Sequence, residues 1–161
     1  MIKIDKSVRI IKVDFPDKKI HISNDHTEGY LLIFRKTIWN LDHDFHFTIY
    51  LSDGRKIEVT IKSGYKLDFA STPKLIWFIY PFFDERYAAP ALGHDNFYGG
   101  EVFPKWFNDE FLKVGMEMCG ATEFDQLAFV NSVTLWGWIT YLRHNKKTIA
   151  ENQKHLILEI K

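Results

Sequence analysis

The sequence predicts an α+β fold, in which an N-terminal antiparallel β-sheet is followed by a C-terminal cluster of about four helices. Two observations predict it. Apolar and polar residues alternate through much of the first 65 residues, and a helical period with capping residues follows. Because strands come first, the helices are expected to pack on one face or end of the sheet. We expect a single domain over 1–161, with mainly strands in 1–66, mainly helices in 67–145, and a tail or short strand in 146–161.

Five strands are expected in the N-terminal part: "SVRIIKVDF", "KKIHI", "YLLIFRK", "FHFTIYLS" and "RKIEVTIK". In the last of these, Ile57, Val59 and Ile61 alternate with polar residues, as expected of a sheet with one buried face. Asp53 and Gly54, between the last two strands, favour a two-residue hairpin turn. The C-terminal "KHLILEIK" is expected to be either a short strand returning to the sheet or a docking tail.

Four helices are expected after residue 66. The first begins at Ser71 or Thr72 before Pro73, since a hydroxyl cap and a proline in the first turn mark a helix start. The second covers "ERYAAPALGHDNFY" and ends at the following glycine pair, with Pro90 confining its regular part to the residues after 87. The third runs through "PKWFNDEFLKVGMEMCG", and the fourth opens with the capping-box variant "TEFD".

Composition limits the classes of partner. Lysine plus arginine and aspartate plus glutamate both total 21, so the formal net charge is zero. The chain has no global field to attract nucleic acid, and no nucleic-acid partner is expected. A single cysteine, Cys119, rules out an internal disulfide and fits synthesis in a reducing cytoplasm. The apolar runs are shorter than the ~20 residues that span a bilayer, so no transmembrane helix is expected.

The most informative polar residues lie in the second and third helices. If residues 88–98 are helical, His94 and Tyr98 share a face, whereas Asp95 turns about 100° away. A catalytic histidine needs its second nitrogen held by a group from another element. Asp109 is the candidate, since the short loop "GGEVF" makes the two helices antiparallel neighbours. His94 also fits a purely structural residue near a helix end, and this alternative stays open.

A further polar group lies at the junction of strands and helices. The loop "LDFASTP" brings Asp68 and the hydroxyls of Ser71 and Thr72 to a usual location for functional residues, although the same residues fit an ordinary turn and helix cap. The segment "DHDFH" has a metal-like composition. However, His43 and His46 differ in parity and are expected on opposite faces of a strand, so no site is predicted there.

Three segments, "GYKLDFASTP", "AAPALGHDNFYGG" and "WFNDEFLKVGMEMCG", resemble an uncharacterised phage and prophage family, domain of unknown function 1353. Its motifs D-x-A-S-x-P and H-D-x-x-Y are matched without gaps at residues 68–73 and 94–98. Its third motif has a phenylalanine three residues after an aspartate, where this chain has Leu112 after Asp109. The resemblance covers about residues 64–120. It implies a phage-encoded protein, made in the host cytoplasm and incorporated into the virion beside other tail or virion proteins.

An H-D-x-x-Y helix followed by a helix with a buried aspartate is also similar to the core of phospholipase A2 enzymes. That similarity implies His94 as the general base for water, Asp109 as its orienting partner and Tyr98 as the residue that holds Asp109. It also implies calcium as cofactor, ligated by Asp95 and by the preceding loop with Asp68, and membrane lipid as substrate. Where that family has a glycine-rich calcium loop, this chain has "YKLDFASTP".

The leading hypothesis is therefore a phage-encoded, tail- or virion-associated protein with a hydrolase-like His/Asp site. Two alternatives remain. The same polar cluster suits a structural tail or baseplate component, in which hydrogen bonds join the sheet to the helices. A phage effector that binds a host protein is the other, with Trp77 and Phe82 of "LIWFIYPFF" as its contact residues.

Overall fold

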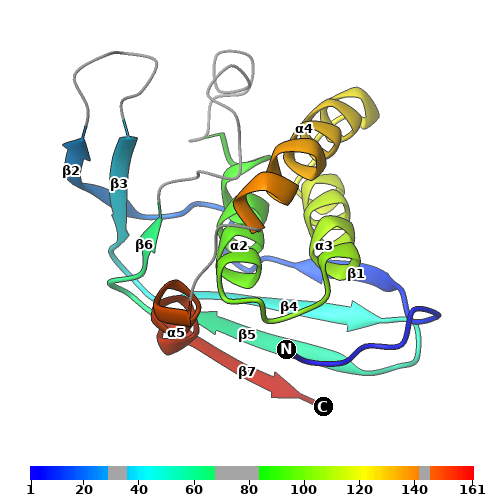
Figure 1. The fold of residues 1–161 in the computed structure, drawn as a ribbon. Helices are drawn as coiled ribbons and strands as arrows, with labels where there is room; N and C mark the ends of the chain where they lie inside the picture. The colour runs from blue at the N-terminus through cyan, green and yellow to red at the C-terminus, as the bar shows by residue number, and fades with distance from the viewer. Residues whose placement is uncertain (29–35, 68–83, 142–145) are drawn as a thin grey trace.

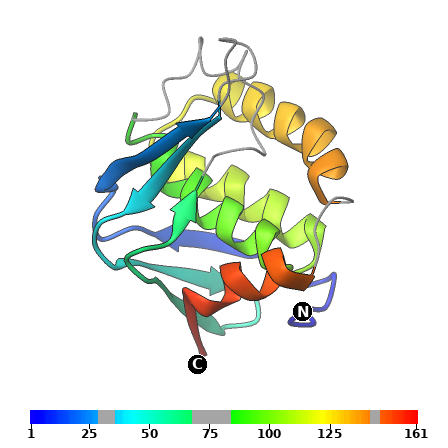
Figure 2. The same ribbon diagram turned by 60° about the vertical axis from the view of Figure 1, so that its left-hand side comes forward.

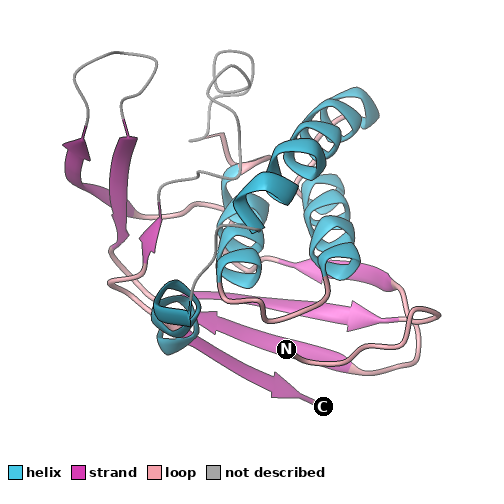
Figure 3. Cartoon of the chain, viewed as in Figure 1, coloured by secondary structure: helices cyan, strands magenta, loops and turns pink. Residues whose placement is uncertain are grey.

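The computed structural model describes residues 1–28, 36–67, 84–141 and 146–161. The predicted α+β fold is confirmed, because antiparallel sheets built mainly from the N-terminal part are followed by helices (Figures 1 and 3). Helices α2 (Ala88–Gly99) and α3 (Lys105–Met118) lie side by side over one face of the larger sheet (Figures 1 and 2). This helix pair carries most of the polar residues that the sequence marks as functional.

The larger sheet has four antiparallel strands in the order β1-β4-β5-β7, namely β1 (Ile10–Asp14), β4 (Phe45–Leu51), β5 (Lys56–Ile61) and β7 (Leu156–Ile160). The predicted alternation in β5 is confirmed, since Ile57, Val59 and Ile61 are buried between half-buried polar residues. The C-terminal segment is the short returning strand of the two predicted alternatives. It pairs with β5, with Leu158 opposite Val59.

The smaller sheet has three antiparallel strands in the order β2-β3-β6, namely β2 (Ile22–Glu28), β3 (Lys36–Leu41) and β6 (Lys66–Leu67). The strand predicted over "KKIHI" is wrong in position, because β2 begins only at Ile22. The strand predicted at "YLLIFRK" falls mostly outside the described residues. The two-residue β6 was not predicted, since it is too short for an alternating pattern to be visible.

The hairpin between β4 and β5 is confirmed, but its loop has three residues instead of two. Leu51 N donates to Arg55 O at 2.9 Å, and Gly54 N donates to Leu51 O at 3.1 Å, so residues 52–54 form the loop. Gly54 has a φ of +88°, a left-handed conformation that glycine adopts without steric cost. A glycine in this conformation is the usual third residue of a three-residue hairpin.

The second, third and fourth predicted helices are confirmed. Helix α4 (Glu123–Tyr141) starts with the predicted reciprocal cap, in which Asp125 N donates to Thr122 Oγ1 and Thr122 N donates to Asp125 Oδ2, both at 3.2 Å. The helix predicted to start at Ser71 or Thr72 lies outside the described residues. Helix α5 (Lys146–Lys154) was not predicted, because it buries no residue and shows no apolar stripe.

Phenylalanine rings fill the space between the helix pair and the larger sheet. Phe47 of β4 lies 5.3 Å from Phe111 of α3, and Phe111 lies 5.1 Å from Phe97 of α2, measured between ring centroids. All three side chains are at most 2% exposed. The aromatic core therefore fixes α2 and α3 both to the sheet and to each other. Across the described part of the chain, no helix is long and apolar enough to cross a bilayer.

Candidate functional site

His94 lies on α2 at its contact with α3, and its side chain is only 1% exposed. The two helices approach closely just before it. At Gly93, an added Cβ would lie 2.7 Å from Cζ of Phe111, so only glycine fits there without movement of the ring. The close packing of the Phe111 ring on the backbone of α2 accompanies a helix contact at which polar residues of α3 lie near the His94 imidazole.

Two carboxylates flank the imidazole. His94 Nε2 lies 3.8 Å from Asp109 Oδ1 on α3, and His94 Nδ1 lies 3.9 Å from Asp95 Oδ1 on α2. Both distances exceed a hydrogen bond, so the attraction is electrostatic in this geometry. The sequence led us to expect Asp95 to turn away from His94, whereas its carboxylate reaches the imidazole from the neighbouring position. The side chain of Asp95 is 10% exposed and that of Asp109 is 20% exposed, so the site reaches the surface through these two carboxylates.

Lys105 and Tyr98 complete the cluster. Lys105 Nζ donates to Asp109 Oδ2 at 2.6 Å, one helical turn away on α3. The Tyr98 ring stacks on the His94 ring with 5.1 Å between centroids, and Lys105 Nζ lies 5.9 Å from the centroid of the Tyr98 ring. Asp109 is therefore shared between an ammonium group and the imidazole, and Tyr98 packs along both.

The surroundings of His94 and Asp109 move their pKa values in opposite directions. Burial lowers the pKa of His94 and is the largest single influence, but attraction to Asp109 and Asp95 together outweighs it, so the pKa lies above its ordinary value of 6.5. Burial likewise raises the pKa of Asp109, but His94 and Lys105 outweigh it and hold that pKa below its usual value. The arrangement strengthens the basicity of His94 while keeping Asp109 ionised.

Among the described residues, buried polar atoms without a hydrogen-bond partner include His94 Nε2 and Asp109 Oδ1. Such atoms are uncommon in folded proteins and call for an explanation, functional sites being one of the usual ones. These two atoms face each other at 3.8 Å. A movement of less than about 1 Å would convert the contact into a charge-assisted hydrogen bond, as happens in active sites that tighten when substrate binds.

Part of the predicted site lies outside the described residues: Asp68, Ser71 and Thr72, together with Trp77 and Phe82. Within the described ranges, no group of three or more histidine, cysteine, aspartate or glutamate side chains has the geometry to hold a metal ion. Asp95 alone supplies too few of the about six to eight oxygen ligands that Ca²⁺ takes. Calcium binding by Asp95 and Asp68 stays a prediction.

Sequence reasoning missed three polar residues at this helix pair. Asn96 and Asn108 are fully buried, and Asn108 Nδ2 donates to Phe103 O at 3.4 Å. Nothing in the sequence distinguishes them from exposed asparagines. Lys105 could have been found, because it precedes Asp109 by four residues and this spacing pairs opposite charges on a helix.

The family model described as "Protein of unknown function (DUF1353)" matches residues 39–129, more than half of the chain, and the matched range contains both His94 and Asp109. No curated protein and no solved structure matches the chain. The predicted resemblance over about residues 64–120 is thus confirmed, whereas the phage origin and the likeness to phospholipase A2 stay predictions. The chain belongs to the family of proteins of unknown function DUF1353.

Proposed function

We propose that this chain is a hydrolase in which His94 takes a proton from water. The observation that supports it most is the position of the imidazole, 1% exposed and flanked by the carboxylates of Asp109 and Asp95. A histidine between carboxylates has a raised pKa and is a stronger base for water. The side chains of Asp95 and Asp109 are 10% and 20% exposed, so in this proposal a substrate approaches the imidazole past these two carboxylates.

The two nitrogens of His94 have different roles in this proposal. Nε2 faces Asp109, which holds the ring and stabilises the imidazolium, and Lys105 holds Asp109 in turn. Nδ1 is the base: it takes a proton from water while the oxygen of that water bonds to the carbonyl carbon of an ester. When the tetrahedral intermediate collapses, the ester C–O bond breaks and the leaving alkoxide takes the proton back from Nδ1. Water is consumed, and an acid and an alcohol are released.

The substrate that we propose is a phospholipid ester, on the similarity of the H-D-x-x-Y segment to phospholipase A2 enzymes. Release of fatty acid from phosphatidylcholine vesicles, with and without calcium, tests it. His94→Gln should lower the rate by about 10²- to 10⁴-fold, the usual contribution of a general base. The exposed Glu117 on α3 gives a matched control, since Glu117→Gln should leave the rate unchanged. Equal rates for wild type and a folded His94→Gln would contradict the proposal.

A structural joint is the second candidate, and one observation favours it. Asn96 and Asn108 are fully buried in the same helix pair as His94, which is typical of a polar network that fixes helix packing. In this case the wild type would hydrolyse neither phospholipid nor cell-wall peptidoglycan. His94→Gln would then lower the midpoint of thermal unfolding, whereas Glu117→Gln would not.

We further propose that the protein is phage-encoded, made in the host cytoplasm and assembled with other tail or virion proteins. The support is the family resemblance of the D-x-A-S-x-P and H-D-x-x-Y segments. The zero formal net charge favours protein partners over nucleic acid. Immunodetection of the chain in phage particles purified by density gradient tests this proposal, and its absence from intact particles would contradict incorporation into the virion.

A further inference from the structure

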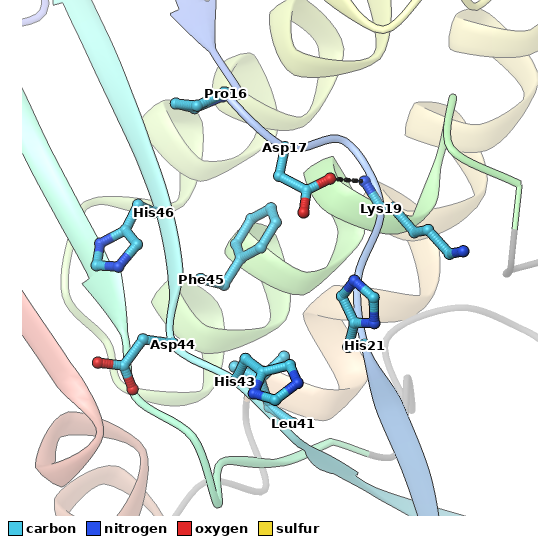
Figure 4. A pocket seen from close by; sticks show the side chains of 9 residues that line it. All are labelled: Pro16, Asp17, Lys19, His21, Leu41, His43, Asp44, Phe45 and His46. Atoms are coloured by element: carbon cyan, nitrogen blue, oxygen red, sulfur yellow. Dashed lines mark hydrogen bonds between the residues drawn. The ribbon is translucent and has the colours of Figure 1, made fainter.

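A pocket of about 290 Å³ lies between the segment that joins β1 to β2 and the turn between β3 and β4 (Figure 4). Leu41 and Phe45, both buried, and Pro16 form the apolar part of its lining. Two histidines and the carboxylate of Asp17 lie around the Phe45 ring in Figure 4. The pocket shares no residue with the cluster around His94 and needs its own explanation.

The two histidines, His21 and His43, come from different segments that the smaller sheet brings together. His21 directly precedes β2, and His43 lies in the turn after β3. The backbone is fixed between them, since Asp42 N donates to His21 O at 2.8 Å. The two rings lie 5.5 Å apart between centroids, at an interplanar angle of 64° (Figure 4). Both side chains are exposed, so solutes reach them directly.

The separation of the rings suits shared coordination of one metal ion. Zinc binds imidazole nitrogen at about 2.0–2.1 Å, so two imidazoles on one tetrahedral ion have ring centroids roughly 5 Å apart. The observed 5.5 Å is close to this value. Because both rings are exposed, rotation of the side chains can direct one nitrogen of each towards the same point without disturbing the core.

The fixed charges around the pocket nearly cancel, because Lys19 lines it beside Asp17, so the two imidazoles decide which class of ligand it suits. Asp17 contributes a carboxylate to the lining, and its Oδ1 accepts a hydrogen bond from the backbone N–H of Lys19 at 2.9 Å. Asp44, which also lines the pocket, is paired with Lys62 at 2.7 Å. Neutral imidazole is a common ligand for zinc, nickel and copper ions, whereas calcium and magnesium prefer oxygen.

We propose that His21 and His43 together bind one transition-metal ion of the zinc, nickel or copper class. Among the described residues, no group of three or more potential ligands has metal-binding geometry, so solvent fills the other coordination positions. Structural zinc sites use four protein ligands. The site is therefore an exchangeable, two-ligand site and not one that holds the fold together.

Calorimetric titration of the full chain with zinc chloride, in a buffer that does not bind metal, tests the proposal. We expect one zinc ion per chain at this site, and His21→Ala or His43→Ala should each weaken binding roughly tenfold or more. His46→Ala is the matched control. His46 lines the same pocket, but its Nδ1 is hydrogen-bonded to Thr60 Oγ1 at 2.8 Å, so its loss should leave zinc binding unchanged.

Ring signals in NMR spectra locate the ion independently of affinity. Zinc should shift the ring resonances of His21 and His43 and leave those of His46 and His94 in place. The proposal is overturned if the wild type binds no zinc, if the His21 and His43 variants bind it as the wild type does, or if His46→Ala weakens binding equally. None of these three outcomes bears on the hydrolase proposal, because a His94→Gln variant should still bind zinc at His21 and His43.

Discussion

His94 Nε2 lies 3.8 Å from Asp109 Oδ1, across the contact between α2 and α3. The two residues are brought together by a tight helix pair, since Gly93 lets the Phe111 ring approach the backbone of α2. Lys105 then holds the other oxygen of Asp109. We therefore expect this packing contact in the apolar core to set the distance between the two ionisable groups.

Removing the Asp109 charge should lower the pKa of His94. Burial opposes protonation of the imidazole, and Asp109 is one of the two carboxylates that reverse this effect. In Asp109→Asn one of them is gone, so the His94 pKa should fall relative to wild type. NMR titration of the His94 ring signals measures this directly. An unchanged pKa in Asp109→Asn would mean that the two side chains do not interact in solution.

The raised pKa of His94 in the wild type also predicts how the free energy of unfolding depends on pH. The pKa of His94 is raised above its ordinary value of 6.5, so the folded chain binds this proton more tightly than the unfolded chain does. The resulting stabilisation is complete below about pH 6.5 and is lost as the pH rises through the folded pKa. Urea unfolding at a series of pH values across this interval should show that the free energy of unfolding declines with rising pH in wild type. This decline should be absent from His94→Gln. A wild type that gains stability relative to the variant as pH rises would contradict the prediction.

Lys105→Met should destabilise the protein by about 1–2 kcal/mol, because it removes a charge-assisted hydrogen bond to a partly buried carboxylate. Methionine keeps the apolar stem of the side chain, so the change tests the charge. Lys113 is exposed on the same helix, and Lys113→Met should stay within about 0.5 kcal/mol of wild type. Denaturant unfolding of wild type and the two variants measures both losses. Equal losses of stability in the two variants would show that the Lys105–Asp109 hydrogen bond does not stabilise the fold.

Asn152→Ala should loosen α5. Asn152 Oδ1 accepts a hydrogen bond from Tyr65 OH at 2.9 Å and so connects α5 to the chain just before β6. We expect a loss of about 1 kcal/mol in stability and faster amide hydrogen exchange in α5. Tyr65→Phe should give a similar loss, and the double variant should lose less than the sum of the two. Strict additivity would indicate that the two side chains are not coupled.

Much of the helical part was predictable because its signals are local. Pro90 and the glycine pair set the limits of α2, and the side chains of Thr122 and Asp125 form the predicted cap of α4. Helix α5 was not predictable, since it buries none of its residues and its stability comes from contacts with distant residues. The hairpin loop was misjudged by one residue, because Asp53 and Gly54 suit loops of either length.

The two candidate sites differ in how far sequence could predict them. The approach of His94 and Asp109 could be expected, because a short loop makes their helices antiparallel neighbours. The pairing of His21 with His43 could not, because it depends on the register of β2 and β3, which places Ile22 opposite Leu41. The parity expectation does not apply to His43, which lies in the turn after β3, and His43 and His46 line the same pocket.

Gly93→Ala should destabilise the protein although alanine is the better helix former. In an open helix the change would add about 1 kcal/mol of stability. Here the new Cβ would lie 2.7 Å from Cζ of Phe111 and 3.1 Å from Cζ of Phe47, so the core must move. Overpacking of this kind costs about 1–3 kcal/mol. The net effect on unfolding should therefore be a loss.

Because Asp109 and Phe111 lie on the same helix, a movement of Phe111 away from the new methyl group should also separate Asp109 from His94. The His94 pKa in Gly93→Ala should then fall towards the value in Asp109→Asn. Phe111→Leu in the Gly93→Ala background provides the control, since the smaller side chain leaves room for the methyl group and should recover part of the stability and of the pKa. A Gly93→Ala variant as stable as wild type, with an unchanged His94 pKa, would mean that this contact does not set the distance between the two groups.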